Sequence, residues 1–470
     1  MAARFVNVDR ATPMFLPCDL REWLPEDHLV HLILDAVDQI STTHFRVNHR
    51  GTGSEQYPPA MMLALLIYCY ATGRFGSRTI EAATHSDVAV RFLCANTHPD
   101  HDSICTFRRE NKAAFEAAFV TVLQLAHQLR LTRVGTVSVD GTKIQANASK
   151  HAAVSYKRAG ELITQFQLEV AELTTRAEQA DVKEAKETLD IPAELARRQK
   201  RIESLQHARA IIEEQAKERA AAEQVEHQAK VAERQAQRDA GKKPRGKEPK
   251  APDDQPGDKD QYNFTDPESR IMKAGNGKHF EQAYNAQAVV DEAMLIVGQR
   301  VSVAANDKQE LAADVAAISP GVKAGVKAVL ADSGFYSEAM VRAVEQASQG
   351  AANVEASGAP RGLTVYAAVE KQSHHKSVAD LLPQPEPAPL AENASAKEKM
   401  AHRMKTQAGR TLYKLRKQTV EPVFGIIKEI IGFRRFLLRG REKVTLEWLL
   451  VCVSYNLKRL FALKKLAVAG

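Results

Sequence analysis

The feature that most constrains the fold is a long helical segment that interrupts a region of strands. Short apolar runs typical of strands occur at residues 137–140 and 142–146, joined by a Gly turn at Gly141, and strand signals resume only near residue 283. Between them, apolar residues from Ile163 to Ala180 recur at spacings of three and four, which predicts one amphipathic helix over residues 157–187. The segment therefore predicts a helical insertion within one α/β domain.

The insertion is expected to be a helical hairpin followed by a linker. Asp190 can cap a second helix, and Pro192 is tolerated in its first turn. Residues 241–260 are charged and rich in Pro and Gly, which predicts a disordered linker. The strand signals that follow lie at residues 283–290, 294–303, 328–331 and 363–369.

The first 131 residues have the periodicity of helices. Apolar residues share one helical face at Leu29, Leu32, Ile33, Val37 and Ile40. Further helices are expected near Ser77 and Ser103, each an acceptable N-cap, and the last is expected to continue to Leu125. The predicted domains are a helical N-terminal domain at 1–131, the start of the α/β domain at 132–154, the insertion at 155–260, the α/β domain continued at 261–380, a proline-rich loop at 381–396 and a basic helical section at 397–470.

The composition argues against membrane and secreted proteins. The apolar stretch at residues 61–71 is too short to span a bilayer, and the stretch at 444–460 is interrupted by Glu447, Asn456 and Lys458. The chain does not open with a hydrophobic segment and cleavage site, and its five Cys residues include no CxxC pair. We therefore expect a cytoplasmic protein with reduced thiols and no membrane partner.

The net charge of +7 is unevenly distributed along the chain. Residues 397–470 hold 18 Lys and Arg against 5 Asp and Glu, a surplus of +13, which leaves 47 minus 53, or −6, for the rest. A basic segment on an acidic chain is typical of a protein that binds a polyanion, and nucleic acid is favoured over an anionic membrane. A solvated helical face is the alternative interpretation.

Three acidic residues stand out by position. Asp140 and Asp332 each follow an apolar strand, and Glu421 lies where Thr419 can cap a helix whose first turn holds Pro422. Carboxylates in such positions are ligands for Mg²⁺ or Mn²⁺, and two ions about 3.5–4 Å apart can activate an attacking oxygen and stabilise a leaving one. An Asp-Gly pair at a strand end is also a common turn, so the pattern alone leaves both interpretations open.

Three blocks around these residues resemble the catalytic blocks of bacterial insertion-sequence transposases of the DDE type. They are VDGTK at 139–143, LADSGFYS at 330–337 and VEPVFGIIK at 420–428. Further phrases similar to the family are YPP at 57–59, PDHDSI at 99–104, DPESRIM at 266–272 and YNAQ at 284–287. The ordered blocks cover most of the chain outside the insertion and the proline-rich loop.

The resemblance implies a ribonuclease-H-like catalytic core, an α/β fold with a mixed sheet flanked by helices, beside a helical N-terminal domain for DNA binding or assembly. It implies that Asp140, Asp332 and Glu421 are the catalytic residues and hold two divalent ions, Mg²⁺ or Mn²⁺. The family's Tyr, Arg, Glu and Lys signature has counterparts here in kind and order, but Arg416 precedes the glutamate by five residues instead of four, so Lys417 is an alternative. The residues expected to contact DNA are Tyr413, Arg416, Lys428, Arg434 and Arg435.

The function implied by the resemblance is that of a DNA transposase, which cuts the ends of its element and joins the freed 3′-OH to target DNA. Its expected partners are double-stranded DNA, both terminal inverted repeats and target, and further copies of the chain in a synaptic complex. Its expected location is the cytoplasm, on the nucleoid. Two alternatives are a metal-dependent nuclease of the same fold that never joins strands, and a DNA-binding relative whose acidic triad is vestigial.

Overall fold

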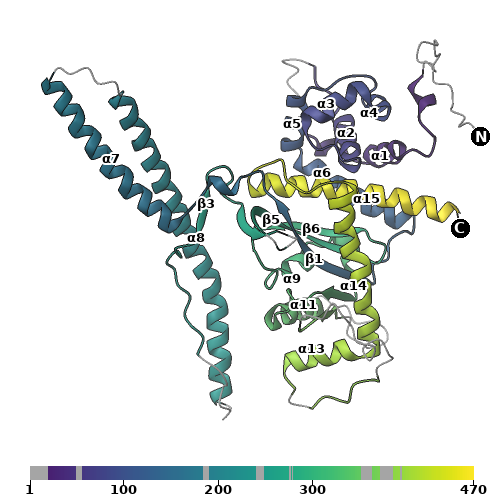
Figure 1. Cartoon of the computed structure of the whole chain (residues 1–470). Helices are drawn as coiled ribbons and strands as arrows, with labels where there is room; N and C mark the ends of the chain where they lie inside the picture. Colours follow the sequence, from purple (N-terminus) through teal and green to yellow (C-terminus); the bar gives the residue numbers. More distant parts are fainter. Residues whose placement is uncertain are drawn as a thin grey trace, which may run out of the picture. The chain divides into compact units, whose positions relative to one another are not determined.

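The computed structural model describes residues 19–48, 55–183, 190–239, 248–274, 277, 279–350, 362–370, 385–391 and 394–469. The proline-rich loop expected at 381–396 therefore lies partly outside the described residues. The chain forms two compact units, one made of Met1–Ile144 with Tyr284–Gly470 and the other of Gln145–Ala283. Figure 1 shows their elements.

Helices dominate the N-terminal part of the first unit. After a short 3-10 helix at Leu20–Trp23 they are α1 (Leu29–Asp38), α2 (Pro59–Ala71), α3 (Ser77–Ser86), α4 (Val88–Leu93), α5 (His101–Glu110) and α6 (Lys112–Gln128). The predicted apolar face of α1 is buried. The single helix expected from Ser103 is in fact two helices that meet at Asn111, and Asp100 caps the first because its carboxylate accepts hydrogen bonds from the backbone of Asp102 and Ser103.

A mixed sheet forms the centre of the first unit. Its strands are β1 (Thr136–Gln145), β5 (Phe280–Asp291), β6 (Ile296–Ser302), β7 (Ala328–Ala331) and β8 (Thr364–Ala367). Their order across the sheet is β6-β5-β1-β7-β8. The β5–β6 pair is antiparallel, whereas β1, β7 and β8 run parallel. The predicted strands after the insertion are thus confirmed, with small shifts at their ends.

The turn predicted at Gly141 is wrong, because β1 continues through this residue. A Cβ atom on Gly141 would lie 2.5 Å from Gln287 Nε2 and 2.8 Å from Asn285 Oδ1 on the neighbouring strand β5. A Cβ atom essentially never has contacts that short, so glycine allows these two side chains to lie against β1. Asp140 is therefore held within a strand instead of at its end.

The remaining helices of the first unit are α9 (Leu311–Ala316), α10 (Pro320–Lys323), α11 (Glu338–Gly350), α13 (Ala396–Lys405), α14 (Gln407–Gly425) and α15 (Arg441–Ala469), with a π-helical segment at Ile426–Ile430.

The expected N-cap at Thr419 is wrong. Thr406 caps α14, and its hydroxyl accepts a hydrogen bond from Gly409 N at 3.0 Å. Glu421 consequently lies in the last turns of α14, not at a helix N-terminus, and Pro422 lies inside the helix. Since Pro422 has no N–H to donate, one helical hydrogen bond is missing shortly before the π-helical segment.

Helix α15 packs against α2 and α6 and also against β6 (Figure 1). Its polar side chains are buried where they hydrogen-bond to the sheet. The Asn456 amide donates to Ile296 O and accepts from Ile296 N, both at 2.8 Å, and Trp448 Nε1 donates to Gln287 O at 3.0 Å. These bonds satisfy backbone groups of β6 and β5 that water does not reach.

The helices in the described part of the chain include none that is long and apolar enough to cross a membrane.

The second unit consists mainly of two long helices that lie side by side, α7 (Tyr156–Lys183) and α8 (Ile191–Asp239). Asp190 caps α8 as predicted, with its carboxylate accepting from Ala193 N at 3.1 Å. Strands β2 (Ala153–Ser155) and β3 (Gln261–Asn263) pair antiparallel at the base, so the two ends of the insertion meet, and β4 (Arg270–Lys273) pairs with residues 280–283. The core comprises Val154, Ala159, Ile163, Leu205, Ala208, Ile212 and Tyr262.

The linker expected to be disordered at 241–260 has ordered contacts in its described part, residues 248–260. Arg219 pairs with Asp260 at 2.8 Å, and Arg238 pairs with Glu248. The second half of α8 has few apolar residues, so ion pairs with the returning chain take the place of apolar packing. Residues 240–247 lie outside the described residues.

Candidate active site

The register between β1 and β7 places two of the predicted acidic residues at the same level of the sheet. The strands are parallel, with Ser138 opposite Leu330. Two residues further in this register, Asp140 on β1 is level with Asp332, which follows directly after β7. β1 continues to Gln145 whereas β7 ends at Ala331, so Asp140 lies inside β1 at the level where β7 ends, beside Asp332.

One oxygen of each aspartate is held by backbone and the other faces an arginine. Asp140 Oδ1 accepts from Gly141 N at 2.9 Å, and Asp332 Oδ1 accepts from Gly334 N at 2.7 Å. The free oxygens lie near the Arg416 guanidinium, with Asp140 Oδ2 at 3.0 Å and Asp332 Oδ2 at 3.8 Å from Nη2. The local backbone therefore orients both carboxylates toward one point.

Glu421 completes a ring of three carboxylates around Arg416. Arg416 Nη1 donates to Glu421 Oε1 at 2.9 Å, five residues further along α14. The Arg416 side chain is 9% exposed, whereas Asp332 and Glu421 are 40% and 47% exposed. The site is thus closed on the protein side by Arg416 and open to solvent at the two outer carboxylates.

The crowding of negative charge affects protonation at the innermost carboxylate. Burial raises the pKa of Asp140 to about 7, the positive charge of Arg416 opposes this rise, and the negative charge of Asp332 adds to it. A buried carboxylate beside another carboxylate favours a nearby cation, since the cation offsets both effects.

A pair of hydroxyls fixes α14 against β1 beside the acidic residues. Thr419 Oγ1 donates to Leu415 O at 2.8 Å and lies 2.8 Å from Ser138 Oγ, which must then be the donor between the two hydroxyls. Both residues are buried. Ser138 precedes Asp140 by two residues and Thr419 precedes Glu421 by two, so this bond sets the spacing of the two carboxylate-bearing elements.

The residues expected to contact DNA fall into two groups. Lys428 Nζ donates to Lys143 O at 2.9 Å, which ties it to β1 beside the carboxylates. Tyr413 is half-buried, and burial raises the pKa of its hydroxyl, with smaller effects from Arg416 and the three carboxylates. By contrast, Arg434 and Arg435 are exposed after the π-helical segment, and Arg434 pairs with Glu429.

The sequence leaves open whether Arg416 or Lys417 corresponds to the arginine of the family signature, and the two side chains differ in their contacts with Glu421. Arg416 contacts Glu421, Asp140 and Asp332, whereas Lys417 is exposed.

A second polar cluster beside β1 was not predicted from the sequence. Asp307 Oδ1 accepts from Asn285 Nδ2 at 2.6 Å and from Gln287 Nε2 at 2.8 Å, and it lies 3.7 Å from Lys143 Nζ. Burial lowers the pKa of Lys143, and the negative charge of Asp307 opposes this shift. The polar residues at alternating positions of YNAQ, within an otherwise apolar strand, were the available signal.

The three carboxylates suit a divalent cation in their chemistry. In the described part of the chain, no group of three or more His, Cys, Asp or Glu side chains lies close enough to hold a metal ion as arranged. The guanidinium of Arg416 lies where their free oxygens converge. The atoms available as metal ligands are all carboxylate oxygens, and they already surround one cationic group. Such a set of oxygen ligands suits a hard ion such as Mg²⁺ or Mn²⁺.

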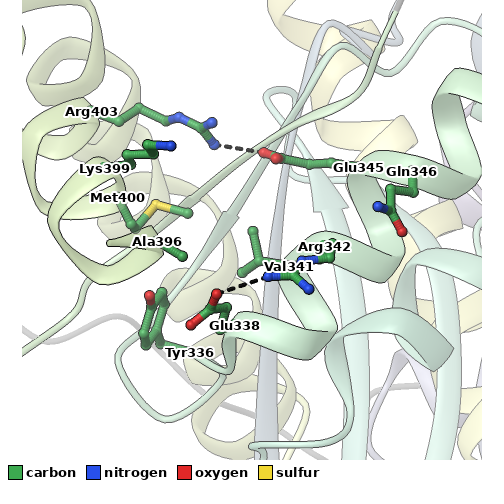
Figure 2. Close-up of a pocket in the computed structure, with 10 residues that line it drawn as sticks. All are labelled: Tyr336, Glu338, Val341, Arg342, Glu345, Gln346, Ala396, Lys399, Met400 and Arg403. Carbon is green, nitrogen blue, oxygen red and sulfur yellow. Dashed lines mark hydrogen bonds and ion pairs between the residues drawn. The ribbon is translucent and has the colours of Figure 1, made fainter. Parts of the chain in front are cut away.

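A pocket of about 310 Å³ lies apart from these carboxylates, between α11 and α13 (Figure 2). Arg403 Nη1 donates to Glu345 Oε1 at 2.6 Å and to Val365 O at 2.6 Å, which joins α13 to α11 and β8. Arg342 pairs with Glu338 on the same wall at 2.9 Å. None of the predicted site residues lines this pocket.

Comparison with known families gives two matches. A family model described as Transposase DDE domain matches residues 387–461, which include Glu421, Arg416 and Lys428. A family model described as Transposase domain (DUF772) matches residues 18–110, the region of α1 to α5. Asp140 and Asp332 lie outside both matched ranges. None of the curated proteins or solved structures compared with the chain matches it.

Proposed function

We propose that this chain, which belongs to the DDE-type transposases of insertion sequences, cuts the ends of its element and joins the freed 3′-OH to target DNA. Water hydrolyses one phosphodiester at each end, which leaves a 3′-OH. That hydroxyl then attacks a target phosphodiester in line and displaces the target's own 3′ oxygen, so one bond forms for each bond broken. Positioning and charge neutralisation supply most of the catalysis in such transfers.

The observation that carries this proposal is the convergence of Asp140, Asp332 and Glu421 on a single cation. These three residues would hold the divalent ions. Bound there, Mg²⁺ or Mn²⁺ would act as a Lewis acid on the attacking and leaving oxygens. The sheet order supports a ribonuclease-H-like core, since Asp140 on central β1 is level with Asp332, which directly follows the parallel neighbour β7.

Other residues of the chain have proposed roles in holding DNA. Lys428 lies beside the carboxylates, bonded to Lys143 O of β1, where its ammonium group can contact the phosphate next to the scissile bond. Arg434 and Arg435 are exposed in the segment that carries the +13 surplus, which suits phosphate contacts further along the duplex. We assign assembly and end recognition to helices α1 to α6, and synapsis to a homo-oligomer.

The test is strand transfer by the full chain on a labelled duplex that carries one end of the element. Wild type with Mg²⁺ is expected to give both cut and joined products. Asp140→Asn, Asp332→Asn and Glu421→Gln each keep the side-chain shape but remove a charged ligand, so each should abolish both products while DNA binding is kept. Glu442→Gln, an exposed residue on α15, is the matched control.

The products also separate the alternatives. Cutting without joining would favour a nuclease, and binding with neither product would favour an inactive relative. A triad variant with wild-type cleavage would contradict the role proposed for that residue.

A further inference from the structure

The Arg416 guanidinium contacts all three carboxylates of the proposed site at once. It reaches Asp140 and Glu421 through different nitrogen atoms, at 3.0 and 2.9 Å, and Asp332 at 3.8 Å. A guanidinium is suited to this contact because its planar fork presents donors on separate nitrogen atoms, whereas a lysine ammonium has all its donors on one nitrogen. Arg416 therefore acts on the site as a cation that belongs to the chain.

The position of Arg416 is not compatible with simultaneous occupation of the site by other cations. Three carboxylates carry three negative charges when ionised, one guanidinium offsets one of them, and two divalent ions would bring four positive charges. A guanidinium held in contact with the same oxygens would repel those ions and block their coordination. Metal binding must therefore displace Arg416 from at least one carboxylate.

Exposure and hydrogen bonding around Arg416 favour such an exchange. Asp332 and Glu421 are the exposed members of the ring, so an incoming ion meets them before it meets Asp140. The Arg416 Nε–H is buried and has no hydrogen-bond partner among the described residues, so the side chain is incompletely satisfied where it lies. A change of side-chain rotamer is enough to take a guanidinium away from a carboxylate, because an arginine side chain has several rotatable bonds.

We infer that Arg416 is a positioning residue that holds the three carboxylates together before metal arrives and is then exchanged for the divalent ions. The inference rests on the proposed function, because it assumes that the carboxylates bind metal. It adds that metal affinity is set by competition with a residue of the chain, and that the guanidinium released by metal becomes available to a DNA phosphate. Metal binding at the carboxylates and the contact of Arg416 with DNA phosphate are then coupled.

The test measures Mn²⁺ binding to the full chain without DNA, from the loss of the free-ion electron paramagnetic resonance signal. Removal of a neighbouring charge typically changes the affinity of an ionisable site by about tenfold or more. Arg416→Gln should therefore bind Mn²⁺ at least about tenfold more tightly than wild type, and Arg416→Lys should lie between them. Lys417→Gln removes the same charge from the next, exposed residue and should change the affinity less than about twofold.

Two outcomes are distinguishable. If folded Arg416→Gln binds Mn²⁺ no more tightly than Lys417→Gln, the competition is refuted. If adding Asp140→Asn leaves Mn²⁺ binding unchanged in both the wild-type and the Arg416→Gln backgrounds, the proposed metal site itself is refuted.

A measurement on wild type covers the case in which Arg416→Gln does not fold. The Arg416 guanidinium protons, assigned in an arginine-labelled sample by comparison with Arg416→Lys, should exchange slowly with solvent without metal and rapidly at saturating Mg²⁺. Protection that persists at saturating Mg²⁺ would overturn the inference.

Discussion

Replacement of Thr419 by Val tests whether the hydroxyl pair holds α14 in register with β1. Valine has nearly the shape of threonine but cannot accept the hydrogen bond from Ser138 Oγ. That hydroxyl would stay buried without its partner, which costs about 1–3 kcal/mol of the free energy of unfolding. Ser138→Ala should cost less, about 0.5–1.5 kcal/mol, because Thr419 still donates to Leu415 O.

The double variant makes the prediction sharper. With both hydroxyls removed, no polar group of the pair is left unsatisfied, so the double variant should be more stable than the sum of the single effects implies. Thr411→Val is the matched control, because Thr411 lies on the exposed face of α14 and its hydroxyl donates only to Gln407 O among the bonds described. Its effect should stay within about 0.5 kcal/mol.

The assay is urea unfolding followed by tryptophan fluorescence. Trp448 is fully buried on α15 and reports on the unit that contains the site. Mg²⁺-dependent cleavage by Thr419→Val should fall as well, because Glu421 loses its fixed distance from Asp140. If Thr419→Val and Thr411→Val lower the free energy of unfolding by the same amount, the hydroxyl pair does not hold α14 against β1, and the reasoning fails.

Two further predictions concern Gly141 and Asp314. Gly141→Ala should cost about 1–3 kcal/mol of unfolding free energy, because its Cβ would overlap Gln287 and Asn285. The control in the same urea assay is Gly135→Ala, because a Cβ there would have its nearest neighbour at 3.9 Å. Equal losses of stability in the two variants would refute the packing argument. Burial raises the pKa of Asp314 to about 7, so the folded chain binds this proton more tightly than the unfolded chain, and stability should decline between about pH 4 and pH 7 with a limiting slope of about 1.4 kcal/mol per pH unit. Asp314→Asn should remove that part of the slope when unfolding is measured across this pH range, and an unchanged slope would assign it to other groups.

Periodicity predicted most of the secondary structure because each signal is local. The apolar run at 328–331 is β7 without adjustment, and the spacing from Ile163 predicted α7. The errors arose where one local pattern has two structural meanings. Glycine after Asp140 is as compatible with a turn as with a crowded strand, and the two interpretations are separated by Gln287 and Asn285, which lie on β5 far along the chain. Thr419 resembles a cap unless the helix is known to begin at Gln407.

The candidate site shows the same limit at longer range. Spacing and the family resemblance predicted Asp140, Asp332 and Glu421 as a set. The contact of Arg416 with all three could not be predicted, because it depends on how α14 packs on β1 and on the register of β1 with β7. Arg416 was expected to face DNA, and the structure shows it among carboxylates. The catalytic and DNA-binding roles of these residues stay predictions.

The packing of α15 has a consequence for how copies of a transposable element are inactivated by mutation. The helix is the 29-residue segment Arg441–Ala469, and it packs against α2, α6 and β6. A frameshift or stop codon late in the reading frame that removes only this segment would uncover the apolar surfaces of elements encoded hundreds of nucleotides upstream. Because α2 and α15 pack together, a change of side-chain volume in one of the segments matched at 18–110 and 387–461 also affects the packing of the other.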